Sequence, residues 1–350
     1  MQTPAWGATK SGWTSLSLGW FVGEDLVGTG LILLRKVPKV DRYLAYLPEG
    51  PDLKWDCADD VDRAIAALVN FAKERNVFQI KMGPHVWIRR WNGETLKEAI
   101  SQASVKAIGD LQPDEVNESA VALTKQLQQL GWRQHKAEAS GFGDYQPRFV
   151  FQISLAGKTE EEIFEGFNQQ WRRNIRKAEK EQVTIRQGTI TDLDIFHTCY
   201  VETAQRDHFI PRSLNYFQTM WSAMREEALE RISLFLATHP DHDGAIAATT
   251  MTRVGNHAWY SYGASTTAAR DLRPSNAVQW EMIKTALRDG AEIYDMRGIS
   301  DTLESDNPLF GLIQFKLGTG GYAQEYVGEW DYVLSPLWAK AFSLYMSRRR

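Results

Sequence analysis

The chain has 350 residues, of which 43% are hydrophobic and 24% are charged. These proportions are typical of soluble globular proteins, and the length allows about two domains of ordinary size. The formal net charge of −4 excludes a polycation that coats nucleic acid or anionic lipid, so any such contact has to be local.

Cysteine content and hydropathy bear on the cellular compartment. Only Cys57 and Cys199 are present, which excludes a disulfide scaffold and favours a reducing environment. No segment approaches the roughly 20 apolar residues that a membrane span needs, and the N-terminal residues lack the pattern of a secretion signal. We therefore expect a cytoplasmic protein.

The first part of the chain predicts a β-hairpin, a helix and a strand, in that order. Residues 17–24 and 26–35 are two apolar or alternating segments around a turn, which is the pattern of a hairpin. Residues 59–75 place apolar side chains on one helical face behind acidic capping residues. Residues 77–82 form an apolar run that predicts a buried strand.

The middle of the chain contains the predicted domain boundary. A turn-like, Gly-rich stretch at 137–147 precedes a predicted strand at 148–155, and we place the end of the first domain there. Thr159 and Glu162 have the spacing of a capping box at a helix start. Apolar residues then recur at helical spacing and predict one apolar stripe: Phe164, Phe167, Trp171, Ile175 and Ala178.

The second half repeats the plan of the first. Residues 232–238, 245–254 and 257–264 are separated by turns and predict a three-stranded meander. A helix over 275–289 and a strand over 292–296 follow. Two copies of one α/β unit are the simplest interpretation.

A cluster of positive charge lies opposite the apolar stripe. It consists of Arg172, Arg173, Arg176, Lys177 and Lys180. One helical face with this charge can bind phosphates, and the alternative is an ordinary solvated face. Asn168 and Asn174 argue against the alternative, because Asn is a poor choice for a helix surface.

A second group of polar residues begins at Arg206. Arg212 and Tyr216 are four residues apart, so a helix that starts near Ser213 would present both to an anionic ligand. Arg206 is a further candidate contact, and its alternative is an ion pair with Asp207 or another acid.

The third group surrounds Phe315 and Lys316. A strand that ends near Arg297 is followed by a short predicted helix from Pro308, which carries this pair to a Gly-rich run at 318–321. Such glycines permit close backbone approach to a ligand, and the lysine can stabilise developing negative charge. The alternative is a turn with a surface lysine. The sequence lacks the Walker, Rossmann and G-x-S-x-G motifs.

Taken together, these segments resemble the Fem family (FemABX-type) of peptidoglycan-bridge aminoacyltransferases. The resemblance spans most of the chain and is carried by Trp6 with Lys10, residues 33–38, 46–51 and 146–148, the helix around Trp171, and residues 206–212, 262–265 and 311–329. It implies an α/β fold with mixed sheets, built as two tandem acetyltransferase (GNAT)-like domains. We expect residues 1–149 and 326–350 to form the first domain and residues 150–325 the second.

The resemblance also implies the reaction and its partners. Family members transfer an amino acid from aminoacyl-tRNA to a stem-peptide amine of a peptidoglycan precursor, which is UDP-MurNAc-pentapeptide or lipid II. Lipid II as acceptor would bring peripheral contact with the inner membrane face. The ester is already activated, so positioning and oxyanion stabilisation can suffice, and we expect no cofactor and no metal.

Particular residues match the family's functional positions. Lys36, Arg212, Tyr216 and Tyr262 match positions that bind the phosphate, sugar and peptide of the precursor. Phe315 and Lys316 match the pair near the acyl ester, where Lys316 is expected to stabilise the tetrahedral oxyanion. For tRNA binding we predict Arg172, Arg173, Arg176 and Lys177, with the terminal residues 348–350 as a second candidate and an unstructured tail as their alternative.

The sequence departs from the family pattern in two places. Relatives commonly carry an acid before the proline after the first domain's last strand, whereas this chain has Lys81-Met-Gly83-Pro84. This departure disfavours a carboxylate base there and favours an amine that is bound neutral or loses its proton to water. The long helical hairpin of some members is also missing from residues 190–290.

Two other functions remain open. One is an acyl-CoA-dependent N-acyltransferase on the same fold, although the sequence contains no clear [QR]-x-x-G-x-[GA] pyrophosphate loop. The other is a non-catalytic protein that binds tRNA or peptide, which the missing acid before Pro84 favours.

Overall fold

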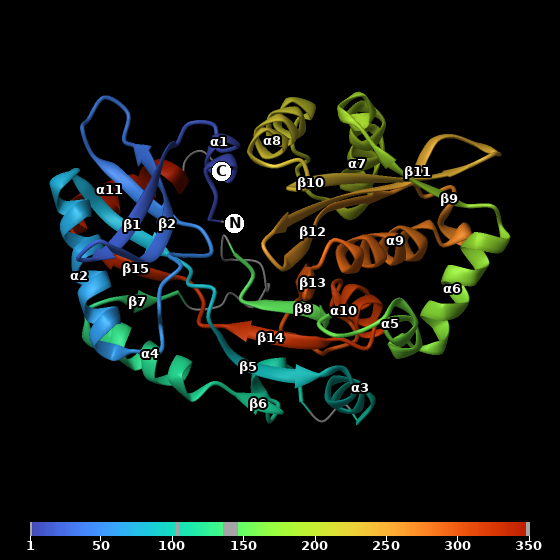
Figure 1. The fold of residues 1–350 in the computed structure, drawn as a ribbon, viewed down its shortest axis with the longest axis horizontal. Helices are drawn as coiled ribbons and strands as arrows, with labels where there is room; N and C mark the ends of the chain where they lie inside the picture. The colour runs from blue at the N-terminus through green and yellow to red at the C-terminus, as the bar shows by residue number, and fades with distance from the viewer. Residues whose placement is uncertain (1, 103–104, 136–145, 348–350) are drawn as a thin grey trace.

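The structure is a computed structural model that describes residues 2–102, 105–135 and 146–347 (Figure 1). Two mixed β-sheets lie side by side, each covered by helices, and the chain passes between them several times. Most of the predicted turn at 137–147 and the basic terminus 348–350 lie outside the described residues. In the part of the chain that is described, no helix has the length and apolar character needed to cross a membrane.

The first sheet has six strands in the order β1-β2-β3-β4-β15-β7. Their bounds are β1 (Thr14–Val22), β2 (Asp25–Lys36), β3 (Tyr43–Leu47), β4 (Val77–Met82), β15 (Trp330–Val333) and β7 (Arg133–Gln134). The hairpin β1–β2 and the strand β4 confirm the predictions for this region. β3 and β4 pair in parallel, which the crossover through helix α2 (Ala58–Glu74) permits.

Helix α2 covers one face of this sheet. Its buried side chains, Val61, Ile65, Leu68 and Ala72 among them, form one core cluster with Ile32 of β2 and other strand residues. Each large aliphatic side chain that is fully buried contributes roughly 1.5–3 kcal/mol. The other helices that contact the first sheet are α1 (Pro4–Ala8), α4 (Glu118–Gln129) and α11 (Pro336–Ser347).

The second sheet has nine strands in the order β6-β5-β14-β8-β13-β12-β11-β10-β9. Their bounds are β6 (Glu115–Val116), β5 (Trp87–Asn92), β14 (Tyr322–Tyr326), β8 (Phe149–Ser154), β13 (Ile293–Gly298), β12 (His257–Ser265), β11 (His242–Val254), β10 (Ile232–His239) and β9 (Thr184–Gly188). β10, β11 and β12 confirm the predicted meander. β12 and β13 pair in parallel across helix α9 (Pro274–Arg288), as β3 and β4 do across α2.

Helices cover the second sheet on both faces (Figure 1). One core cluster contains residues of α3 (Gly93–Gln102), α5 (Glu160–Gly166), α6 (Gln169–Lys180), α9 and α10 (Phe310–Leu317). Another contains residues of α7 (Leu193–Asp207) and α8 (Leu214–Glu227), together with Ala5 of α1. Short 3-10 turns lie at Ile108–Asp110, Ile190–Asp192 and Arg270–Leu272.

The predicted helical stripe around Trp171 is wrong in one respect, because two helices carry it rather than one. α5 ends at Gly166, Phe167 is extended, and Asn168 accepts a hydrogen bond from the backbone N–H of Trp171 as the cap of α6. The capping box of Thr159 and Glu162 is confirmed. Asn168 is therefore explained by capping and not by a ligand.

Strand pairing bears on the predicted domain limits. β15 lies in the first sheet, although β14 immediately before it lies in the second. β5 and β6, which precede residue 149, also pair within the second sheet. The division at 149/150 and 325/326 remains a prediction.

Candidate active site

A cavity of about 420 Å³ lies between the two sheets. β2, β3 and β4 line it from the first sheet, and β11, β12 and β13 line it from the second, with α1 and α8 adding side chains. Six of the described lining residues are aromatic: Trp6, Trp13, Tyr46, Tyr216, Trp259 and Tyr262. We refer to this space as the central cavity.

The charge of the central cavity is positive. Five described lining residues are cationic, namely Lys10, Arg35, Lys81, Arg212 and Arg297, whereas Glu49 is the one acid among them. Cations held between aromatic rings in a partly desolvated space favour an anionic ligand that also has apolar or ring surfaces.

The pair predicted from spacing, Arg212 and Tyr216, does meet here. Ser213 caps α8 by accepting a hydrogen bond from the backbone N–H of Tyr216, and the Arg212 guanidinium lies 5.4 Å from the centre of the Tyr216 ring. The hydroxyls of Tyr216 and Tyr262 lie 2.9 Å apart. Three of the predicted substrate-binding residues therefore line one wall.

Lys10, which follows α1, lies next to these residues in the cavity. Its Nζ lies 3.5 Å from the hydroxyl of Tyr216 and 3.5 Å from the centre of the Trp6 ring. Burial, with the Arg212 charge, lowers the pKa of Lys10 to about 8. The sequence resemblance included Lys10 without giving it a role, and the structure adds it to the candidate site.

Two of the predicted substrate-binding residues lie outside the cavity lining, as do Phe315 and Lys316. Lys36 is exposed and lies 3.5 Å from Asp41, while its neighbour Arg35 lines the cavity, because successive side chains of a strand face opposite ways. Arg206 makes the alternative contact, an ion pair of 2.9 Å with Asp207, and also donates to the carbonyl of Ser265 at 2.7 Å. Their roles in substrate binding remain predictions.

Lys316 lies in the interior, with 3% of its surface exposed, so the alternative of a surface lysine is wrong. Its Nζ donates to the carbonyl oxygens of Gly298 at 2.7 Å and Arg297 at 3.3 Å. Burial lowers its pKa from 10.5 to about 7. Near neutral pH this lysine is therefore poised between its charged and uncharged forms.

Phe315 joins α10 to the basic helix α6. The centres of the Phe315 and Trp171 rings lie 4.7 Å apart, and the indole N–H of Trp171 donates to the carbonyl of Phe315 at 2.7 Å. Two glycines of the run after Lys316 are required by close packing, Gly318 against α6 and Gly321 against β8. A Cβ at Gly318 would lie 2.1 Å from Cδ1 of Trp171, and one at Gly321 would lie 2.1 Å from the carbonyl oxygen of Gln152.

The basic face of α6 is largely open to solvent. Arg173, Arg176 and Lys177 are exposed, and Arg172 is half-buried and donates to the carbonyl of Glu165 at 3.0 Å. Asn174 donates to Oδ1 of Asn276 at 3.2 Å, so its place on the helix is structural. The face thus remains available for phosphate, and a solvated face is equally compatible with these contacts.

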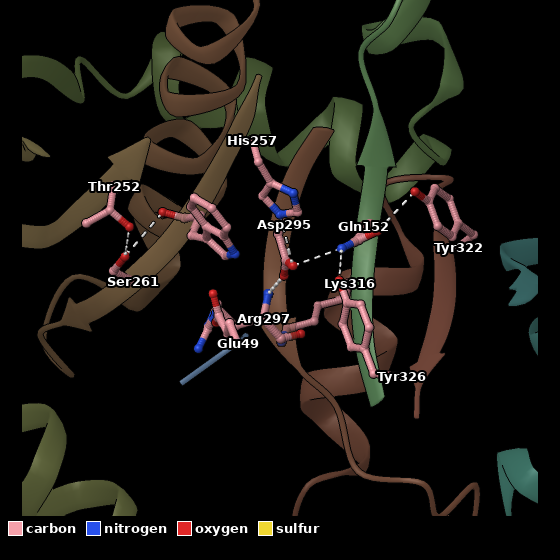
Figure 2. Close-up of polar contacts among 11 residues, drawn as sticks. Glu49, Gln152, Thr252, His257, Ser261, Asp295, Arg297, Lys316, Tyr322 and Tyr326 are labelled. Atoms are coloured by element: carbon pink, nitrogen blue, oxygen red, sulfur yellow. Dashed lines mark hydrogen bonds and ion pairs between the residues drawn. The ribbon is translucent and has the colours of Figure 1, made fainter. Parts of the chain in front are cut away.

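A buried polar network behind the cavity escaped the sequence analysis (Figure 2). Asp295, with 1% exposed surface, accepts hydrogen bonds from the Gln152 side chain at 2.9 Å and the backbone N–H of Arg297 at 2.6 Å, and its Oδ2 lies 3.3 Å from Nε2 of His257. The available signal was an acid inside the apolar strand 293–296, where an unpaired carboxylate would be costly.

Arg297 connects this network to the first sheet. Its guanidinium donates to Glu49 at 2.9 Å (Figure 2), and both residues line the central cavity. Burial opposes ionisation of Glu49, but the positive charges around it, Arg297 among them, hold its pKa well below the usual range. The two sheets are thus tied by an ion pair at the cavity wall.

Residues 81–84, which lack the acid expected from the family pattern, lie beside these groups. Gly83 lines a smaller cavity of about 20 Å³ together with Glu49, Asp295 and Arg297. Lys81 lies 3.1 Å from Asp331 and 3.9 Å from Glu329, so carboxylates near this segment come from β15 and the residue before it. Within the described residues, no group of three or more His, Cys, Asp or Glu side chains is arranged to hold a metal ion.

Comparisons with known proteins agree on one family. The model of the FemAB family matches residues 1–238 and 223–346. The lipid II:glycine glycyltransferase of Staphylococcus epidermidis is 26% identical over 398 positions, which cover 96% of this chain and 88% of that protein. The same enzyme of Staphylococcus haemolyticus is 26% identical over 402 positions, with 96% and 88% coverage.

Solved structures agree on the fold. The crystal structure of FemX superposes with a TM-score of 0.80 at 21% identity, over 97% of this chain and 93% of that one. A tandem GNAT protein from the clavulanic acid pathway superposes with a TM-score of 0.52 at 11% identity, over 93% and 85%. The predicted fold of two tandem GNAT-like units is confirmed.

Proposed function

The chain belongs to the FemAB family, and from this premise we propose that it is an acyltransferase that moves an amino acid from aminoacyl-tRNA to a stem-peptide amine of a peptidoglycan precursor. The names of the relatives, lipid II:glycine glycyltransferases, make glycine and lipid II the first donor and acceptor to test. The central cavity is the observation that carries the proposal.

The cavity supports an acceptor with phosphate, sugar and peptide parts. Its cations complement a diphosphate, and its aromatic rings suit sugar and peptide surfaces. Arg212, Tyr216 and Tyr262 are the proposed ligands, to which we add Lys10. Arg35 is the cation of β2 that faces the cavity in this structure, so it joins Lys36 as a candidate for the phosphate contact.

The proposed chemistry needs one oxyanion stabiliser. The acceptor amine forms a bond to the ester carbonyl carbon, and the tetrahedral oxyanion then collapses as the bond to the ribose oxygen breaks. The amine proton goes to water, and the ribose oxygen leaves as a hydroxyl after taking a proton. Lys316, in its charged form, is the proposed stabiliser, and Phe315 lies beside it in α10.

The connection between α6 and α10 supports the placement of the donor. Trp171 of α6 packs on Phe315, so phosphates bound along Arg172, Arg173, Arg176 and Lys177, on the opposite face of α6, would hold the donor beside the helix that contacts α10. Binding of this kind depends steeply on salt, because each phosphate contact releases counterions.

A transfer assay tests the proposal. Purified protein is mixed with radiolabelled glycyl-tRNA or a pool of aminoacyl-tRNAs and with either lipid II or UDP-MurNAc-pentapeptide. We expect label in one acceptor and none when the tRNA is deacylated. No transfer to either acceptor, with acetyl-CoA consumed in a parallel amine screen, would instead indicate an acyl-CoA-dependent enzyme. No activity in either assay would indicate a binding protein.

A further inference from the structure

Asp295 is a buried carboxylate that holds a bulge of β13 in place. The bulge is residues 295–298, the last part of β13, where the pairing with β8 shifts register, and Figure 2 shows Gln152 and His257 converging on the Asp295 side chain. Such a carboxylate is retained only where donors compensate its desolvation, and three groups do so here. Arg297, whose backbone N–H is one of these donors, has a φ of 66°, in the left-handed region.

The conformation of this bulge decides where Lys316 lies. A left-handed φ is uncommon for a residue with a long side chain and persists when surrounding contacts fix it, which the hydrogen bond to Asp295 does. The bulge directs the carbonyls of Arg297 and Gly298 toward α10, and these two oxygens accept hydrogen bonds from the Lys316 Nζ.

We propose that Asp295 is the positioning residue for Lys316, acting through the bulge 295–298 of β13 and held in place by His257 and Gln152. The role of Lys316 in the reaction rests on the proposed function, whereas the placement of its ammonium by Asp295 does not. Asp295 needs no contact with substrate for this role.

The charge of Asp295 also acts on the ammonium group of Lys316. The charged groups that act on Lys316 are Asp295, which raises its pKa, and Arg297, which lowers it, both from β13, against the larger lowering by burial. Two more titratable groups lie beyond these: Glu49 contacts Arg297, and His257 contacts Asp295. Removal of the Asp295 charge should therefore make Lys316 lose its proton at lower pH, and removal of the Arg297 charge should do the reverse.

The experiment titrates Lys316 directly in the full chain, without substrate. Protein with ¹³C-labelled lysine is followed by NMR from pH 5 to pH 10, and the Lys316 signal is identified by its loss in Lys316→Met. In Asp295→Asn we expect the midpoint to fall by about one pH unit, the scale of a nearby charge. In Arg297→Met we expect it to rise, and Asp289→Asn, which removes an exposed charge at the end of α9, should leave it unchanged.

The outcomes separate the inference from the proposed function. An unchanged midpoint in folded Asp295→Asn overturns the inference, whatever the activity. A lower midpoint with a reduced kcat and an unchanged acceptor KM supports both proposals. A lower midpoint in a protein whose Lys316→Met variant keeps full activity supports the positioning role but refutes the catalytic role of Lys316. If Asp295→Asn does not fold, the direction of the shift in Arg297→Met, whose side chain is partly exposed, decides.

Discussion

The burial of Lys316 predicts that removing it makes the protein more stable and less active. In the unfolded chain this lysine is charged below pH 10.5, whereas in the folded protein it is charged only below about 7. At pH 6 the folded protein therefore carries a buried ammonium. The drop in pKa from 10.5 to about 7 corresponds to about 5 kcal/mol of lost stability, at about 1.4 kcal/mol per pH unit.

The expected gain in Lys316→Met is smaller than this figure. Methionine has a similar length but cannot donate to the carbonyls of Arg297 and Gly298, and each unsatisfied buried group costs about 1–3 kcal/mol. Together the two carbonyls cost about 2–6 kcal/mol, so the net gain at pH 6 is at most about 3 kcal/mol. Between pH 7 and pH 10.5 the unfolded state binds more protons than the folded state, so the wild-type protein gains stability as pH rises and the advantage of the variant declines.

Urea unfolding of wild type and Lys316→Met at pH 6, 8 and 9.5 measures this trend. Lys97→Met, on the exposed side of α3, is the matched control and should show no pH-dependent difference. In the transfer assay, kcat of Lys316→Met should fall about 10²–10³-fold, as for loss of one oxyanion donor. Wild-type kcat should also fall as pH rises through about 7. A stability difference that stays constant from pH 6 to pH 9.5 would refute the assignment of a buried, charge-penalised lysine.

Three further variants test other parts of the site. Arg212→Met should raise the acceptor KM about tenfold or more with little change in kcat, as measured by initial rates, because the guanidinium lines the central cavity, whereas Lys316, the proposed oxyanion stabiliser, does not. Reversal of Arg173 and Arg176 to Glu should weaken tRNA binding and flatten its salt dependence in filter-binding assays, and an unchanged salt slope would argue against α6 as the tRNA surface. Asn168→Ala should cost about 1 kcal/mol in unfolding experiments, since it removes the cap of α6, whereas a larger effect on kcat than on stability would indicate a direct role in the reaction.

Local patterns in the sequence were sufficient to predict several of the individual elements. The hairpin β1–β2, helix α2 and the meander β10–β12 each bury one face. Their apolar residues therefore recur at the spacing of a strand or a helix, which can be recognised within a short segment of sequence. The break at Phe167 was missed because apolar residues continue at helical spacing through it, while the cap that starts α6 is a single Asn. A stripe of apolar residues does not by itself show that one helix carries it.

Long-range pairing could not be predicted in the same way. β14 inserts between β5 and β8 of the second sheet, and β15, a few residues later, joins the first. Nothing local distinguishes these two short strands, because the choice depends on partners more than 150 residues earlier in the chain. The same holds for Glu49 and Arg297, which meet between the two sheets although they lie 248 positions apart in the sequence.

The candidate site differs from the sequence prediction where strand direction and burial decide. Family resemblance pointed to Lys36, but the pleat of β2 turns its neighbour Arg35 into the cavity. Spacing alone correctly brought Arg212 and Tyr216 to one side of a helix start. The burial of Lys316 required the tertiary structure, since a lysine beside glycines is equally compatible with a surface turn.

The bulge 295–298 of β13 links parts of the site that lie far apart in the sequence. Its aspartate is buried among donors of the second sheet, its arginine pairs with Glu49, which follows β3 of the first sheet, and its carbonyls accept hydrogen bonds from Lys316. Buried charges of this kind lower stability unless they are fully paired, so their concentration at one bulge is better explained by a demand for fixed geometry than by folding. Because Arg297 also lines the central cavity, an acceptor that contacts its guanidinium would act on the same backbone bulge that places Lys316.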